Sequence, residues 1–117
     1  LLKSDGTNTS KAITEKGYFT VTSSAITAFT AVAGDQLLVD TTQTTVTITL
    51  PAAPAVGDEV VFIDARGTFA SNALTIERNG KPINSGTNNL ALNTNGQAIT
   101  LVFIDSTRGW AYKTNTA

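Results

Sequence analysis

Hydrophobic and polar residues alternate most regularly between Thr44 and Leu50. In an extended chain Val46, Ile48 and Leu50 would point to one side, and the threonines between them would point to the other. This period of two predicts a β-strand that buries one face and exposes the other to water. Pro51 then ends the strand, because proline has no N–H group to donate to a neighbouring strand.

Two other segments, Glu59–Ile63 and Ala98–Ile104, are apolar at nearly every position. In the first of them Val60 and Phe62 would point to one side, and Val61 to the other. Strands with two apolar faces are typical of the middle of a sheet that is covered on both sides. We therefore predict two central strands that are buried on both faces.

Shorter runs of β-branched and aromatic residues, separated by turns that contain Gly, Asn or Asp, predict further strands. These are Phe19–Val21, Ile26–Val32, Gln36–Val39, Leu74–Glu77, Leu90–Leu92 and Trp110–Lys113. Asn79-Gly80 and Asn95-Gly96 predict hairpins, since Asn and Gly tolerate the positive φ of tight turns. The one helical segment that we expect is a short turn over Pro51–Val56.

The whole pattern predicts an all-β fold, an antiparallel β-sandwich or small barrel of about eight short strands. Residues 1–17 are polar and have no apolar period, which predicts an extended linker or a trimerisation segment. We place the β-sandwich domain at residues 18–117. Because residue 1 is Leu and not Met, we expect the chain to be a fragment or a processed form.

The chain of 117 residues has a formal net charge of -1 and contains neither Cys nor His. It therefore lacks a thiolate nucleophile, a disulfide and a Ser-His-Asp triad. We expect no enzyme activity, no cofactor and no bound metal. The basic residues form no stripe, so nucleic acid is not an expected partner. No apolar run approaches the roughly 18 residues of a membrane helix, so we expect no membrane insertion.

A short sequence echo links the two predicted central strands. The sequence VFID at 61–64 is followed by Arg66, VFID at 102–105 is followed by Arg108, and a weaker copy, LVD, lies at 38–40. In one interpretation each Asp caps its turn by accepting hydrogen bonds from backbone N–H groups. In the other, Asp64, Arg66, Asp105 and Arg108 meet at one end of the sheet and bind a ligand or a neighbouring chain. Capping is the commoner use of such residues.

Two further features are candidates for recognition. Trp110 and Tyr112 would share one face of the last strand, where they could form a platform that stacks on a sugar ring. Aromatic residues on one strand face more often pack in a core or a trimer interface, and we favour packing. The polar loop Asn79–Asn89 is either a recognition tip or a solvated connection between strands.

Five motifs lie between Ala33 and Trp110 and extend over about two thirds of the chain: VDTT, TITLP, GDEVVFIDARGTF, LTIERNG and RGW. Together they resemble a β-rich module of bacteriophage tail fibres and other virion structural proteins. The motifs mark strands and turns, so the resemblance concerns the kind of module. The family brings no catalytic residues to this chain.

The resemblance implies a structural component of a virion, in a tail fibre or similar appendage, that assembles as a homotrimer and contributes to attachment to the host surface. The expected partners are copies of the chain itself, other virion proteins, and a bacterial surface glycan or receptor. Such a protein assembles in the host cytoplasm and is extracellular in the mature particle. A small β domain with exposed sheet edges gains stability from association with its own copies.

Two alternative functions use the same residues. A carbohydrate-binding or receptor-binding module would present an exposed aromatic platform or a concave polar site. A fragment of a polysaccharide depolymerase would need two carboxyl groups at a set separation, one of them with a raised pKa. Asp58 with Glu59, or Asp64 with Asp105, are the candidate pairs for that chemistry.

Overall fold

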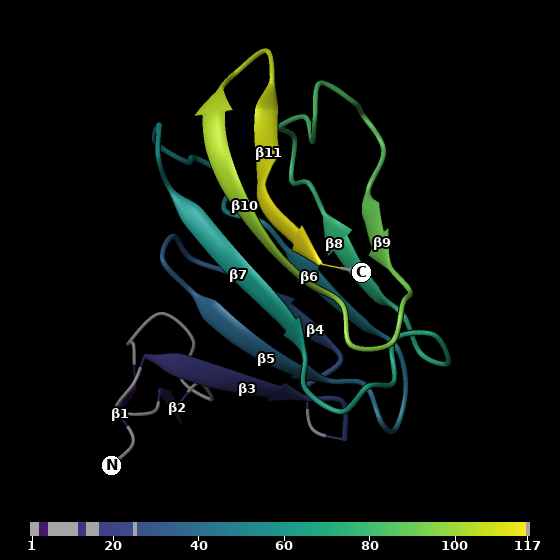
Figure 1. Ribbon diagram of the computed structural model, residues 1–117. Helices are drawn as coiled ribbons and strands as arrows, with labels where there is room; N and C mark the ends of the chain where they lie inside the picture. Colours follow the sequence, from purple (N-terminus) through teal and green to yellow (C-terminus); the bar gives the residue numbers. More distant parts are fainter. Residues whose placement is uncertain (1–2, 5–11, 14–16, 25, 117) are drawn as a thin grey trace.

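The computed structural model of the protein describes residues 3–4, 12–13, 17–24 and 26–116. Over these residues the chain forms strands and turns without a helix, which confirms the all-β prediction (Figure 1). The strands are β1 (Lys3–Ser4), β2 (Ala12–Ile13), β3 (Tyr18–Thr22), β4 (Ala28–Thr30), β5 (Gln36–Asp40), β6 (Val46–Thr49), β7 (Glu59–Asp64), β8 (Leu74–Glu77), β9 (Leu90–Leu92), β10 (Ala98–Asp105) and β11 (Gly109–Thr116).

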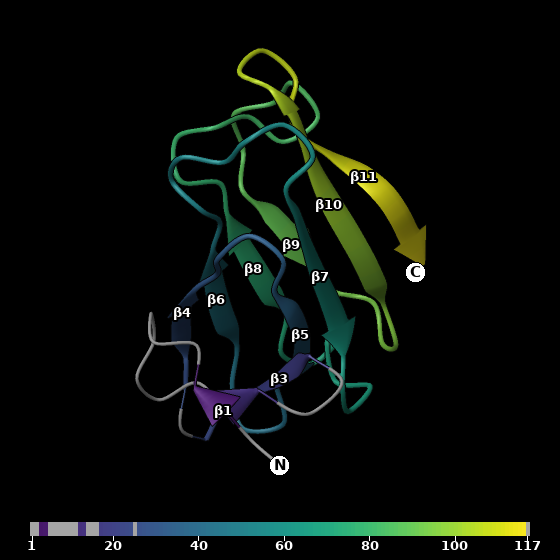
Figure 2. The same cartoon turned by 90° about the vertical axis from the view of Figure 1, so that its left-hand side faces the viewer.

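Strands β3 to β11 form two sheets that enclose one core (Figure 2). The five-stranded sheet has the order β11-β10-β7-β5-β3, and the four-stranded sheet has the order β4-β6-β8-β9. From β3 to β8 the chain crosses to the other sheet after every strand. Neighbouring strands from this part of the chain therefore run parallel, as in stacked coils.

This crossing path corrects the prediction of an antiparallel sandwich. In the two sheets the pairs β7–β10, β10–β11 and β8–β9 are antiparallel, so each sheet is mixed. Neither sheet closes into a barrel, since each has two edge strands. The alternation of residues along a strand indicates which side is buried. It carries no information about the direction of the neighbouring strand.

The core is built from apolar residues that lie in rows across the aligned strands. The rows are Phe19, Leu37 and Phe62 in the five-stranded sheet and Phe29, Ile48 and Ile76 in the four-stranded sheet. Each of these side chains is at most 7% exposed. Full burial of a side chain of this size stabilises the fold by about 1.5–3 kcal/mol. Phe19 and Phe29 close the stack with their ring centroids 5.2 Å apart.

The alternating pattern at Thr44–Leu50 gives the strand that it predicts. Val46, Ile48 and Leu50 are at most 1% exposed and point into the core. The threonines of β6 lie on the outward side and are half-buried. The strand contributes one face to the core and one to the surface, as expected.

The predicted hairpins are corrected in part. Asn79 and Gly80 do have positive φ, but β8 and β9 are joined by a long loop over residues 78–89 and not by a two-residue turn. Gly96 also has positive φ, yet its turn joins β9 to β10, which belong to different sheets. Pro51–Val56 forms bends and no helical turn. The Asn-Gly sequences therefore predicted correctly where the chain turns, but they did not predict which strands pair.

The predicted linker or trimerisation segment, residues 1–17, falls mostly outside the described residues. Within it Lys3–Ser4 pairs with Ala12–Ile13 in a small antiparallel sheet. The first strand of the two larger sheets begins at Tyr18.

Candidate functional site

Asp64 is the last residue of β7 and is 8% exposed. Its Oδ1 accepts hydrogen bonds from the backbone N–H groups of residues 66–68, at distances of 2.9 to 3.3 Å. Its Oδ2 accepts from the N–H groups of Phe69 at 3.1 Å and Gly96 at 2.9 Å. One carboxylate thus joins the turn after β7 to the turn before β10.

The same contacts determine the ionisation of Asp64. Burial acts to raise its pKa, but the backbone N–H groups of Gly96, Phe69, Thr68 and Arg66 outweigh burial and hold the pKa below the ordinary value of 3.8. Asp64 is therefore charged at neutral pH, and its lone pairs are engaged by the backbone. A glycosidase acid needs a raised pKa, so Asp64 does not suit that role.

The other two Asp residues of the sequence echo also cap turns. Asp105 Oδ1 accepts from the backbone N–H groups two and three residues further along the chain, at 2.9 and 2.6 Å. Asp40 Oδ1 accepts from the backbone N–H and the hydroxyl of Thr42, and Asp40 Oδ2 accepts from Arg66 Nε at 3.4 Å. Thr42 and, less strongly, Arg66 lower the pKa of Asp40. The capping interpretation is confirmed.

The structure does not bring Asp64 and Asp105 together. Strands β7 and β10 run antiparallel, so each strand ends beside the start of the other. Ile63 pairs with Ala98, so Asp64 lies opposite Gln97. At about 3.3 Å per residue along β10, Asp64 and Asp105 lie about 26 Å apart. Arg66 and Arg108 follow them at opposite ends of the sheet. The predicted four-residue cluster is therefore wrong, and the separation exceeds the roughly 9.5 Å limit for a glycosidase pair.

Asp58 and Glu59 are engaged in separate structural contacts. Asp58 Oδ2 accepts a hydrogen bond from the backbone N–H of Ala55 at 2.8 Å. Glu59 forms an ion pair with Lys113 Nζ at 3.0 Å. Since the two carboxylates have different partners, they do not form a shared acid–base site.

Trp110 packs in the core and is 0% exposed. Its ring meets Phe103 edge to face, with centroids 5.5 Å apart. The packing interpretation is therefore confirmed for Trp110, which is not accessible to a sugar ring. Tyr112 is 40% exposed on the edge strand β11. The predicted platform of Trp110 and Tyr112 is thus not formed.

The outward side of the five-stranded sheet carries apolar side chains on four strands, interspersed with the polar residues Gln36, Glu59 and Thr100. We call these apolar residues the outer apolar face: Leu38, Val61, Ile63, Val102, Ile104 and Ala111. Ile104 is 42% exposed, and the others are half-buried by their neighbours in the sheet. Among the described residues no strand lies over this side (Figure 2).

The outer apolar face corrects one prediction. We expected β7 and β10 to be buried on both faces, but a single chain buries only the inward side. The four-stranded sheet differs, because its outward side carries Thr47, Thr49, Thr75 and Glu77. The outward side of the four-stranded sheet is therefore mainly polar, whereas that of the five-stranded sheet carries aliphatic side chains among polar ones. The sequence shows apolar residues on the second face of both strands, but it does not show that no other layer of the same chain covers that face.

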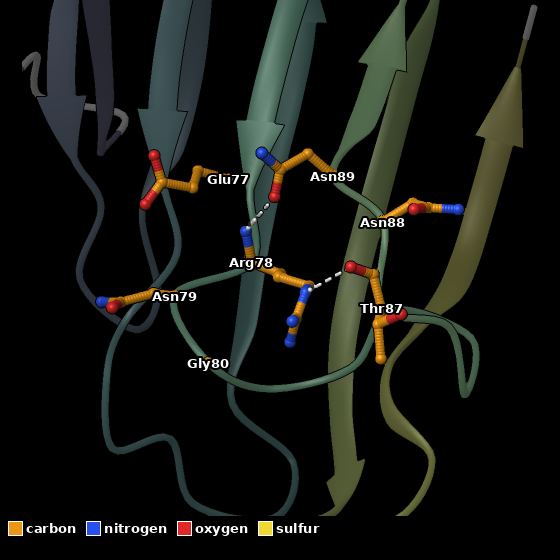
Figure 3. A pocket seen from close by; sticks show the side chains of 7 residues that line it. All are labelled: Glu77, Arg78, Asn79, Gly80, Thr87, Asn88 and Asn89. Carbon is orange, nitrogen blue, oxygen red and sulfur yellow. Dashed lines mark hydrogen bonds between the residues drawn. The ribbon is translucent and has the colours of Figure 1, made fainter.

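A polar hollow of about 530 Å³ lies where β8 ends and β9 begins (Figure 3). It is lined by Glu77, Arg78, Asn79, Gly80, Thr87, Asn88 and Asn89. Most of the lining belongs to the loop Asn79–Asn89, which the sequence marked as a candidate recognition tip. Glu77 and Arg78 were missed, because their proximity to Asn89 follows from the pairing of β8 with β9.

No protein-family model and no curated protein matches the chain. Within the described ranges no helix is long and apolar enough to cross a membrane. The same residues include no group of three or more His, Cys, Asp or Glu side chains placed to hold a metal ion. The candidate sites are therefore the outer apolar face and the polar hollow.

Proposed function

We propose that this protein is a structural module of a bacteriophage virion appendage, such as a tail fibre, and that it assembles as a homotrimer without a catalytic role. The outer apolar face carries the proposal. The phage assignment and the threefold number come from the resemblance of the five motifs to tail-fibre modules. The structure adds a surface on which copies of the chain would meet.

The outer apolar face is comparable in size to the smallest apolar patches that act as functional surfaces on soluble monomers. It extends about 20 Å along β10 and about 15 Å across four strands, or roughly 300 Å². Contiguous apolar patches of about 300–600 Å² are the largest that soluble monomers usually expose, and they are often functional.

The charges near the outer apolar face support contact between identical copies. Lys113 and Glu59 form an ion pair across β10, which lies between their strands. Asp40 and Arg66 form a second ion pair at the ends of β5 and β7. Each pair is neutral as a unit. Two identical faces can therefore approach without the like-charge repulsion that opposes association.

The proposal is tested by placing a charge within the outer apolar face. In the five-stranded sheet Ile63 lies between Leu38 and Ala98. We expect Ile63→Lys to reduce the solution mass from three chains to one, because an interface would bury an unpaired ammonium group at a cost of several kcal/mol. Multi-angle light scattering measures the mass, and circular dichroism verifies that the strands are retained.

Thr75→Lys is the matched control. Thr75 occupies a similar half-buried position between Thr47 and Ala91, on the outward side of the four-stranded sheet. This variant should keep the parent mass. A folded Ile63→Lys variant that still forms trimers would contradict an assembly through the outer apolar face.

A further inference from the structure

The polar hollow is built on a loop whose backbone is fixed from several sides. Arg78 Nε donates to Thr87 O at 2.9 Å, and Asn79 Nδ2 donates to Leu50 O at 3.0 Å. At the far side of the loop, Trp110 N–H donates to Pro82 O at 2.8 Å. The first bond joins the two ends of the loop to each other, and the other two join the loop to the residue after β6 and to β11. A site on the loop is therefore organised before a ligand arrives.

Glu77 and Asn89 are neighbours across this hollow. Ile76 pairs with Leu90, so the next position of the antiparallel register places Glu77 opposite Asn89. Such cross-strand residues have Cβ atoms about 4.5–5.5 Å apart. Asn89 Oδ1 accepts a hydrogen bond from the Arg78 backbone N–H at 3.2 Å. This bond orients the amide and leaves Asn89 Nδ2 as a free donor. Figure 3 shows the Glu77 side chain extending away from Asn89, so the Glu77 carboxylate and Asn89 Nδ2 are separate groups on the rim of the hollow.

The Glu77 carboxylate and the Asn89 amide offer complementary hydrogen-bonding groups to a ligand. The Glu77 carboxylate accepts hydrogen bonds, and Asn89 Nδ2 donates them. A pair of neighbouring hydroxyl groups, one donating to Glu77 and the other accepting from Asn89, satisfies both. The Asn88 amide makes no hydrogen bond with another described residue, so its donors and acceptor are also available on the rim of the hollow.

We propose that the hollow binds a neutral sugar residue of a glycan through Glu77 and Asn89. Its volume lies within the roughly 300–1,000 Å³ of small-molecule sites. Its lining is polar, which suits a ligand rich in hydroxyl groups and offers no pocket for an apolar side chain. The Glu77 carboxylate disfavours acidic sugars. Arg78 keeps its positive charge, but it directs Nε and Nη1 at Thr87 O and Lys81 O, so fewer of its donors are available to an acidic ligand.

This inference rests on the proposed virion role only for the origin of the glycan on a bacterial surface. The hollow belongs to the end of β8 and β9 in the four-stranded sheet. It therefore stays open when copies of the chain cover the outer apolar face of the other sheet. Sugar binding and self-association are independent properties that separate measurements report.

The test is a titration of the full ¹⁵N-labelled chain, followed by NMR, with glucose, galactose, mannose and glucuronate. We expect at least one neutral hexose to shift the backbone amides of residues 77–80 and 87–89 and the side-chain amide of Asn89. Glucuronate should bind at least about tenfold more weakly, because its carboxylate meets Glu77. Shifts confined to other residues, or none with any neutral hexose, would overturn the proposal.

Asn89→Asp is the decisive variant. It keeps the Oδ1 that accepts from Arg78 and replaces the Nδ2 donor by a second acidic oxygen. We expect it to weaken binding of the neutral hexose at least about tenfold, which corresponds to the loss of one good hydrogen bond. Asn93→Asp makes the same chemical change at an exposed residue at the other end of β9, and it should bind like the parent chain.

Two outcomes keep this inference separate from the proposed assembly. A monomeric chain that binds a neutral hexose through Asn89 would retain the sugar site and contradict the homotrimer. A trimeric chain in which Asn89→Asp binds the hexose as tightly as the parent would retain the assembly and overturn the sugar site.

Discussion

Asp64 occupies a position that a hydrophobic residue would normally fill. In the five-stranded sheet it lies beside Val39, and Val39 lies beside Val21, both of which are 0% exposed. A carboxylate there is tolerated because five backbone N–H groups replace the water that it loses. At the residue scale, Asp64 therefore holds two turns from separate parts of the chain in one arrangement.

Replacing Asp64 by Asn should destabilise the protein strongly. The amide has one acceptor oxygen, and its NH₂ group would face N–H donors such as those of Phe69 and Gly96. We expect a loss of about 3 kcal/mol in the free energy of unfolding at pH 7, measured by urea denaturation. Asp105→Asn should cost no more than about 1 kcal/mol, because Asp105 is exposed and caps a single turn.

The pH dependence of the stability difference between the parent chain and Asp64→Asn tests whether the carboxylate charge causes that difference. The pKa of Asp64 is lowered in the folded protein, so its charged form stabilises the fold above its ordinary pKa of 3.8. This contribution is lost as the pH falls through the lower, folded-state pKa. The parent chain should therefore lose its advantage over Asp64→Asn below about pH 4. A difference that stays constant down to pH 2 would show that the carboxylate charge is not responsible.

At the scale of elements, the sequence predicts where the strands lie more accurately than it predicts which strands pair. The apolar runs at Glu59–Ile63 and Ala98–Ile104 end within one residue of β7 and β10. Side-chain periodicity is a local property, so a single strand reveals it. The parallel stacking of β3, β5 and β7 depends on connections that cross between sheets, and no local pattern records that path.

The candidate sites show the same division. The capping Asp residues were predictable because a cap contacts its own turn. The loop of the polar hollow was predictable because it is continuous in sequence. Glu77 was not, because it reaches the hollow through the pairing of β8 with β9. The aromatic platform failed because β11 turns Trp110 into the core beside Phe103, and alternation alone does not say which side of an edge strand faces inward.

The junction between β11 and the loop after β8 gives a prediction for an element. Gly109 has a φ of 73°, and a Cβ on it would lie 1.9 Å from Pro82 O. Gly109→Ala should therefore force the loop away from β11 and cost more than about 3 kcal/mol in urea denaturation. Gly67→Ala is the control, because Gly67 has a similar φ of 68° and no atom within 4 Å of an added Cβ.

The control separates strain from contact. Gly67→Ala should cost about 1–2 kcal/mol, the price of a left-handed conformation for a residue with a side chain. Equal losses in the two variants would show that Pro82 does not press against Gly109 in solution.

At the scale of the whole molecule, the outward sides of the two sheets differ in polarity. The four-stranded sheet shows threonines to solvent, while the five-stranded sheet shows the aliphatic side chains of the outer apolar face among Gln36, Glu59 and Thr100. Apolar side chains on both faces of β7 and β10 are typical of strands that are covered on both sides. A single chain covers only the inward face. In the proposed assembly, copies of the chain supply the other side.

The solution mass of the full chain, measured by light scattering over a dilution series, tests this account most directly. A homotrimer predicts a mass of three times 12.2 kDa that persists on dilution. A mass of 12.2 kDa at every concentration would contradict assembly through the outer apolar face.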